Sequence, residues 1–315
     1  MSSQPPNLPS SADEPLEDDA ATRGSGAGSS GVGAESRTGA GPRLQQLIVT
    51  ICALHARADR PPLAVAELIR LLDALEVDEA AARSALSRLK KRGVLLSTRK
   101  GSSAAYQLNP AMEDVFAEGD ERIFSPRRAQ PGDRWLLAAF SVPESQRHLR
   151  HQIRRVLAGR GFGTVGPGLW IAPEFVYEHL RRELERAGLL EYVELFAADL
   201  LGEQVADRIG DWWDLGALTE LYAGFSAEFE PVLARWRATG PDAPGAESDP
   251  EVDVHAFADD IRVLTAWRRL PYLDPGLPAE YLPPDWAGTS ASALFTELHG
   301  CLAPAAARHA ATIIS

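Results

Sequence analysis

The sequence predicts an α+β protein with three folded units. Residues 43–110 combine helical spacing of apolar residues with two short strands. Residues 133–203 alternate strands and helices in the order βαββαβ, which is the order of a ferredoxin-like unit. Residues 204–315 show helical periodicity almost throughout. We expect a linker helix and connector at 111–132 between the first two units, and a disordered tail at 1–42.

The N-terminal tail is rich in glycine, serine, proline and alanine, as in residues 24–33. A segment of this composition buries too little apolar surface to offset the entropy that it loses on ordering. The composition therefore predicts that residues 1–42 are disordered.

A basic helix followed at once by a hairpin is the most informative feature of the first unit. Residues 79–92 have helical periodicity, and Gly93 provides a residue suited to the end of a helix. Residues 94–99 and 104–108 read as two strands joined by a tight turn. The apolar stripe of the helix consists of Ala82, Ala85, Leu86 and Leu89.

Two further helices are predicted upstream, one beginning at Leu44 and one at 66–75, with a short polar turn at 76–78. Helix, helix, short turn, helix and hairpin is the order of a winged helix-turn-helix, whose last helix enters the major groove of DNA. An ordinary basic surface helix is the alternative interpretation of 79–92. The candidate DNA contacts are Arg83, Ser84, Ser87, Arg88, Lys90, Lys91, Arg99 and Lys100.

The distribution of charge supports this interpretation. The formal net charge of the whole chain is -12, which argues against a protein that coats nucleic acid non-specifically. Residues 43–109, however, contain 11 Lys and Arg against 6 Asp and Glu. A basic unit on an acidic body would orient the molecule on DNA, with the body turned away from the phosphates.

The second unit follows a basic connector at 124–132. Its predicted elements are a strand at 134–142, a helix at 144–160, a hairpin at 162–173, a helix at 175–187 and a strand at 192–197. Residues 161–166 match the letters of the G-x-G-x-x-G dinucleotide motif. That motif needs a strand before it and a helix after it, whereas here a helix precedes and a strand follows. We therefore expect these glycines to shape the hairpin rather than to bind a nucleotide.

No catalytic, metal or cofactor site is predicted. His148 and His151 are three residues apart on a helix, but they lie among arginines that disfavour a bound cation. Cys52 and Cys301 are far apart and form neither a disulfide framework nor a metal motif. Their arrangement and the absence of a signal peptide or membrane-spanning pattern favour a cytoplasmic protein.

The third unit is predicted to contain helices at 217–239, 254–270 and 291–302. Residues 270–288, between the last two, are irregular and rich in proline and aromatic residues. This segment either covers the core or forms one wall of a ligand pocket or dimer interface.

Three stretches of the chain resemble the PaaX family, named after the repressor of phenylacetate catabolism. They are residues 77–94, 161–173 and 269–288. The resemblance runs from about residue 43 to the C-terminus. It implies a winged helix, a ferredoxin-like middle domain and a helical C-terminal domain, in a dimeric transcription regulator that is usually a repressor.

The resemblance also implies partners. They are a double-stranded DNA operator, a second copy of the chain, and an acyl-CoA or aryl-CoA effector, because the repressor that names the family is released by an aryl-CoA thioester. Aromatic residues suit an acyl or aryl group, and arginines suit a CoA phosphate. The candidate effector residues are Trp213, Tyr222, Arg268, Arg269, Tyr272 and Trp286. The alternative is that the aromatic residues are simply core.

Two other functions compete with an effector-controlled repressor. One is a DNA-binding scaffold without a small ligand. The other is a metal-dependent nuclease of the CRISPR-associated ferredoxin-like type, which uses an Asp just after the first strand of that unit. Here the position is Ser141, and Glu144 is a weak substitute, so nuclease activity is disfavoured.

Overall fold

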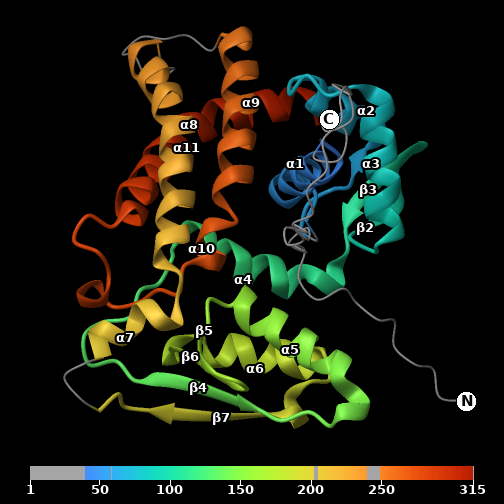
Figure 1. Cartoon of the computed structure of the whole chain (residues 1–315). Coiled ribbons are helices and arrows are strands. Elements are labelled where there is room, and N and C mark those ends of the chain that lie inside the picture. The colour runs from blue at the N-terminus through green and yellow to red at the C-terminus, as the bar shows by residue number, and fades with distance from the viewer. Residues whose placement is uncertain (1–39, 58, 202–204, 240–248, 315) are drawn as a thin grey trace, which may run out of the picture.

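The computed structural model of the protein describes residues 40–57, 59–201, 205–239 and 249–314. Residues 1–39 of the predicted N-terminal tail lie outside the described residues, so their disorder remains a prediction; residues 40–42 are not disordered, because they belong to a helix. Figure 1 shows the winged helix and the long C-terminal helices side by side, above the ferredoxin-like unit. The predicted α+β class, with a ferredoxin-like middle unit and a helical C-terminal unit, is confirmed.

The first unit contains three helices and a three-stranded sheet. Its helices are α1 (Ala40–His55), α2 (Val65–Asp73) and α3 (Glu79–Lys91), and its strands are β1 (Leu63–Ala64), β2 (Leu95–Lys100) and β3 (Ser103–Leu108). The sheet order is β1-β3-β2. The sequence did not predict β1, because only two residues form it, and they do so by pairing with β3.

Helix α3 begins and ends at local signals. The Asp78 side chain accepts a hydrogen bond from the backbone N–H of Ala81 at 2.9 Å, which caps the N-terminus. After the helix, Gly93 adopts a φ of 73°, a conformation that favours glycine and turns the chain into β2. The four predicted stripe residues are all buried.

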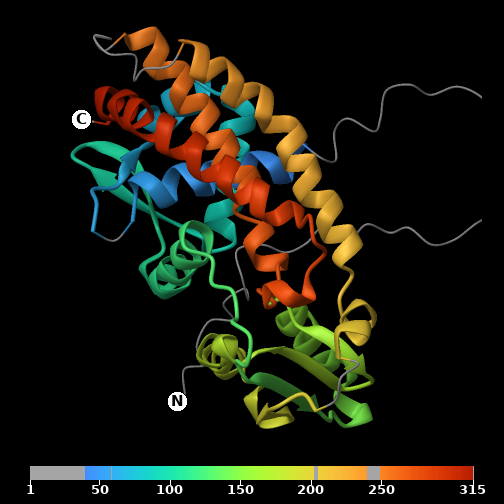
Figure 2. The ribbon, with the colours of Figure 1, turned by 90° about the vertical axis from the view of Figure 1, so that its left-hand side faces the viewer.

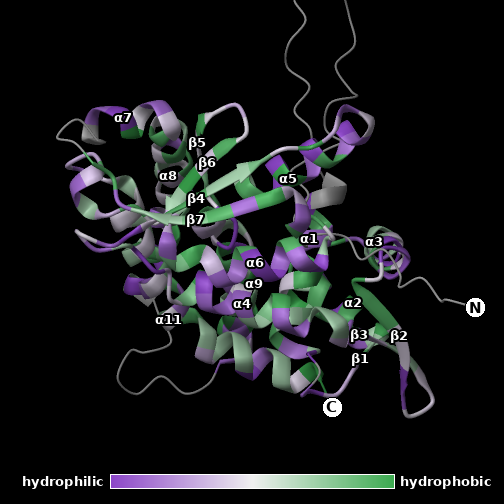
Figure 3. Cartoon of the chain, turned by 90° about the horizontal axis from the view of Figure 1, so that it is seen from below, coloured by the Kyte–Doolittle hydropathy of each residue, from purple (hydrophilic) through white to green (hydrophobic). Residues whose placement is uncertain are grey.

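Helix α4 (Glu113–Phe124) and the connector lead to the second unit. Its elements are β4 (Trp135–Phe140), α5 (Arg147–Gly159), β5 (Gly163–Gly166), β6 (Leu169–Pro173), α6 (Tyr177–Arg186) and β7 (Val193–Ala198). The sheet is antiparallel in the order β5-β6-β4-β7, as in a ferredoxin-like fold. Figure 3 views the molecule from below and shows β7 with both hydrophobic and hydrophilic residues.

The third unit is helical. It contains α7 (Val205–Trp212), α8 (Leu215–Thr239), α9 (Pro250–Trp267), α10 (Leu270–Leu273) and α11 (Ala287–Ile313). The predicted last helix at 291–302 was too short, because α11 continues through Pro304. The continuation is held by packing, since Ala306, Ala310 and Ile313 beyond the proline are buried.

One hydrophobic core joins the first and third units. Phe257 and Ile261 of α9 and Ile313 of α11 belong to the same cluster as the core of the winged helix. A buried hydrogen bond of 2.9 Å from Thr265 of α9 to Thr50 of α1 adds to the joint. Figure 2 shows the long helices packed together above the sheet. The winged helix is therefore fixed on the C-terminal helices rather than suspended from a linker.

Candidate DNA-binding surface and candidate effector cavity

The outer side of α3 is open to solvent. Its buried stripe faces the core, and the six predicted contact residues of the helix are exposed: Arg83, Ser84, Ser87, Arg88, Lys90 and Lys91. At 100° per residue, Ser84, Ser87 and Lys91 lie opposite the buried stripe, with Arg83 and Arg88 on either side. We call these five residues the recognition face.

Arg83 already has an intrahelical partner. Its guanidinium lies 2.7 Å from the Glu79 carboxylate, one turn away. Both side chains are more than half exposed, so the ion pair contributes little to the stability of the helix. A phosphate or a base can therefore replace Glu79 as the partner of Arg83 at a small cost in free energy.

The two predicted contacts of the wing have different surroundings. Arg99 is exposed, and its guanidinium donates to the backbone oxygen of Ser102 at 2.9 Å at the tip of the hairpin. The Lys100 ammonium instead donates to Glu67 at 2.8 Å. Glu67 is buried and also accepts a hydrogen bond from the backbone N–H of Ala64. The structure thus gives Lys100 an anchoring partner inside the unit.

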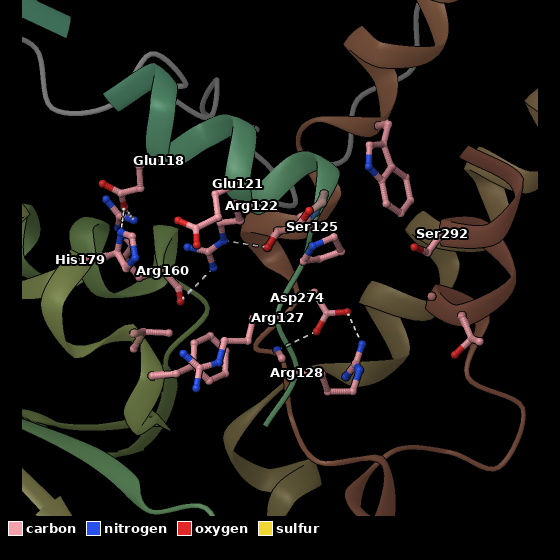
Figure 4. A pocket seen from close by; sticks show the side chains of 18 of the residues that line it. Glu118, Glu121, Arg122, Ser125, Arg127, Arg128, Arg160, His179, Asp274 and Ser292 are labelled. Carbon is pink, nitrogen blue, oxygen red and sulfur yellow. Dashed lines mark hydrogen bonds and ion pairs between the residues drawn. The ribbon is translucent and has the colours of Figure 1, made fainter. Parts of the chain in front are cut away.

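A cavity of about 340 Å³ lies where α4, the connector, α6 and the C-terminal helices meet (Figure 4). We call it the junction cavity. Its charged and titratable lining residues are Glu118, Glu121, Arg122, Arg127, Arg128, Arg160, His179, Tyr222 and Asp274. Its apolar wall includes Pro126, Phe175, Val176, Trp267 and Pro271.

At one end of the junction cavity, Glu118 contacts basic side chains. It is 9% exposed, forms an ion pair with Arg160, and lies 2.9 Å from His179 Nδ1. Burial raises the pKa of Glu118, but the charges and hydrogen bonds of Arg160 and His179 outweigh it and hold that pKa below its usual range. Glu183 is a second partner of Arg160.

At the other end, Asp274 is held by three donors. It accepts hydrogen bonds from Arg128 at 3.1 Å, from the Tyr222 hydroxyl at 3.0 Å and from the backbone N–H of Gly276 at 2.7 Å. Burial, together with Asp274, raises the pKa of Tyr222. Tyr222 therefore stays protonated and remains a donor at neutral pH.

The structure divides the six effector residues predicted from the sequence. Tyr222 lines the junction cavity. Trp286 packs against Tyr222, with ring centroids 5.8 Å apart. Tyr272 lies beside the cavity, with the Arg122 guanidinium over its ring. The Trp286 indole N–H is buried without a hydrogen-bond partner among the described residues.

The other three effector residues lie elsewhere. Trp213 packs against Trp135 and donates to the Gly161 oxygen at 2.8 Å. Arg268 is 8% exposed and lies against Thr50, which places it between α9 and α1. Arg269 is exposed and does not line the cavity.

The arginines of the junction cavity were not predicted from the sequence. Arg122, Arg127 and Arg128 come from α4 and the connector, and Arg160 follows α5. The basic character of the connector was visible, but nothing in the sequence indicated that it meets the C-terminal helices.

The glycine motif has a packing role. It lies between α5 and β6, as expected from the sequence. A Cβ on Gly163 would come within 2.6 Å of the Trp213 ring, so glycine is required for this contact. Near the first strand of the same unit, Glu144 is paired with Arg150 at 3.0 Å. In the part of the chain that the structure describes, no group of three or more potential metal ligands occurs.

Comparison with known proteins shows three family matches in succession. Residues 43–111 match the PaaX-like protein model, 128–209 the central Cas2-like domain of PaaX, and 213–312 the PaaX-like C-terminal domain. The chain belongs to the PaaX family of transcriptional regulators. The resemblance seen in the sequence is thereby confirmed.

A relative of this PaaX family protein is the transcriptional repressor PaaX of Escherichia coli. It is 27% identical over 243 residues, which cover 76% of this chain and 74% of the relative. An uncharacterized protein of Mycobacterium tuberculosis, Rv0674, has a similar structure, with a TM-score of 0.51 and 23% identity. That match covers 84% of this chain and 96% of the other, and it shows a shared fold.

These matches confirm the prediction of a regulator rather than an enzyme. None of the helices in the described ranges is long and apolar enough to cross a membrane. The roles of the individual DNA and effector residues stay predictions.

Proposed function

We propose that this PaaX family protein is a cytoplasmic, homodimeric repressor that binds a double-stranded DNA operator through α3 and the wing. A small effector, with acyl-CoA and aryl-CoA thioesters as the first class to test, releases it. The observation that carries the proposal is the exposed recognition face on a helix whose other side is fixed in the core.

The recognition face combines two kinds of contact. Ser84 and Ser87 can form hydrogen bonds with base edges, and Arg83, Arg88 and Lys91 can bind phosphates or guanine. The net charge of -12 keeps the rest of the molecule away from the duplex.

A dimer doubles the readout, because two winged helices related by a two-fold axis bind a pseudo-palindrome. The dimer surface is expected in the acidic body, since the basic unit must stay open to DNA. A candidate is the outer edge of β7, where Phe196 is 53% exposed.

An effector in the junction cavity has a physical route to the DNA surface through α4. This helix lines the cavity with Glu118, Glu121 and Arg122, and its residues Glu113 and Asp120 form ion pairs with Arg57 after α1. Next to Arg57, the backbone oxygen of Ala56 accepts from the N–H of Leu108 in the wing at 3.0 Å. Movement of α4 would therefore reach the wing.

The test selects bound fragments from random genomic DNA and measures operator affinity at fixed salt. Arg83→Ala and Lys91→Ala should both weaken binding. If both variants kept full affinity, α3 would not be the DNA-binding helix.

A DNA-binding scaffold without a ligand remains the second candidate. It predicts that no acyl-CoA or aryl-CoA thioester, and none of the free acids, raises the apparent dissociation constant of the operator complex.

A further inference from the structure

Two arginines of the junction cavity, Arg122 and Arg127, form no direct ion pair with a carboxylate of the described residues. Among the described residues, the hydrogen bonds of the Arg122 guanidinium go only to backbone oxygens, those of Pro271 at 2.9 Å, Arg160 at 3.3 Å and Tyr272 at 3.5 Å. Arg127 lies over the Phe175 ring at 5.0 Å and forms no ion pair within the same residues. Glu118 and Asp274 favour the charged form of Arg122 at longer range, and Arg127 is exposed to solvent. Neither arginine is held by a direct ion pair with another described residue beside the cavity (Figure 4).

The neighbouring arginines show the contrast. Arg160 has Glu118 and Glu183, and Arg128 has Asp274. The carboxylates of these three acids are thus already engaged. The remaining acidic residue of the lining, Glu121, is exposed.

The nearby acids offset only part of the free-energy cost of burying the charged Arg122 guanidinium. Burial and the charge of Arg160 lower the pKa of Arg122 to about 10. The group remains a cation at neutral pH, and a bound anion would relieve the cost with charge-assisted hydrogen bonds.

The rest of the cavity suits an apolar body. Phe175 and Trp267 contribute aromatic surface, and Pro271 contributes an aliphatic wall. Cavities of a few hundred Å³ with an apolar lining and a few convergent polar groups are typical of small-molecule sites.

We propose that the junction cavity binds an organic anion whose carboxylate or phosphate neutralises Arg122, with Arg127 as the second cation and an aromatic or aliphatic body against Phe175 and Trp267. Binding itself follows from the cavity alone. Only the role of the anion in releasing DNA rests on the proposed function.

The test is calorimetric titration of the full-length protein without DNA. The probes are benzoate, its neutral analogue benzamide, inorganic phosphate, CoA and benzoyl-CoA. Benzoate or a CoA compound should bind. If the carboxylate is the group that contacts Arg122, benzamide should bind at least about tenfold more weakly than benzoate. Binding of benzoate identifies a carboxylate head, whereas binding of CoA and benzoyl-CoA alone identifies a phosphate.

Variants locate the site. Arg122→Met should weaken binding at least about tenfold, and Arg122→Lys should restore part of it. Ser292→Phe places a ring in the cavity from α11 and should abolish binding, whereas Ser290→Phe, exposed on the same helix, is the matched control. If Arg122→Met fails to fold by circular dichroism, Arg127→Met and Ser292→Phe carry the test.

Two results would overturn the proposal: no probe binds the folded protein below millimolar concentration, or binding is unchanged in the folded Arg122 and Ser292 variants. Operator affinity is measured separately. Anion binding that leaves operator affinity unchanged keeps the site and removes its regulatory role. If neither the wild type nor any variant binds DNA, the proposed function is wrong, but the anion-binding site in the junction cavity still stands.

Discussion

The salt dependence of operator binding should separate Lys91 from Lys100, although both were predicted from the sequence to contact DNA. Lys91 lies on the recognition face and is exposed, whereas Lys100 is paired with the buried Glu67. Lys91→Ala should remove a phosphate contact. Lys100→Met should loosen the wing without removing one.

The size of the salt dependence can be worked out from the number of exposed cationic side chains. Each phosphate contact contributes about -0.9 to the slope of log K against log salt concentration. Arg83, Arg88, Lys90, Lys91 and Arg99 are exposed in each protomer. If all five contact phosphates, a dimer should have a slope of about -9. Lys91→Ala, which removes two lysines per dimer, should reduce its size by about 1.8.

The assay is fluorescence anisotropy with a labelled operator at five or more salt concentrations. Lys91→Ala should lower both affinity and slope, while Lys100→Met should lower affinity and keep the wild-type slope. Glu67→Gln is the matched control for Lys100, since it breaks the same pair and leaves the cation in place. A slope reduced equally by Lys91→Ala and Lys100→Met would refute the anchoring role of Lys100.

Four other predictions follow from the same structure. Arg83→Ala should cost about 1–3 kcal/mol on the operator and much less on unrelated DNA if Arg83 contacts a base, which competition binding measures. Phe196→Glu should convert the dimer to a monomer in light scattering at micromolar concentration, and an unchanged dimer would exclude the β7 edge. Glu118→Gln should lower the melting temperature at neutral pH. The pKa of Glu118 in the folded protein is depressed below the ordinary glutamate pKa of 4.5. The difference in melting temperature between wild type and Glu118→Gln should therefore shrink as the pH falls from 4.5 through the folded pKa. Removal of residues 1–39, the part of the predicted tail that precedes α1, should leave the melting temperature unchanged, and a clear fall would show that the segment docks.

The winged helix could be predicted from the sequence because its signals are local. The stripe that contains Leu86 and Leu89 repeats at helical spacing, and Gly93 marks the end of α3. Strand β1 gave no such signal, since pairing with β3 alone defines it. The full length of α11 was missed for a related reason, because its packing outweighs the helix-breaking tendency of Pro304.

The effector site was harder to predict because burial and convergence are not local properties. Trp213 and Arg268 have the chemistry of ligand-binding residues, but contacts with Gly161 and Thr50 use their polar groups within the fold. The cavity arginines come from α4, from the connector after it and from the residue after α5, and they meet only where these segments pack against the C-terminal helices. Composition indicated that anion-binding groups exist, and only the fold indicates which of them lack a direct ion pair among the described residues.

The position of α4 explains how one molecule can combine these properties. The winged helix shares its core with α9 and α11, so its orientation cannot change freely. Helix α4 has both kinds of contact: Phe116 and Ile123 pack against the two helical core clusters, while Arg57 and Arg160 form ion pairs with its carboxylates. Its polar contacts can exchange partners with smaller changes in packing than a hydrophobic core permits. A ligand shifts an equilibrium only through contacts that differ between two states, and an anion on Arg122 would change such contacts. The element most able to transmit a signal is therefore the one that forms the wall of the cavity.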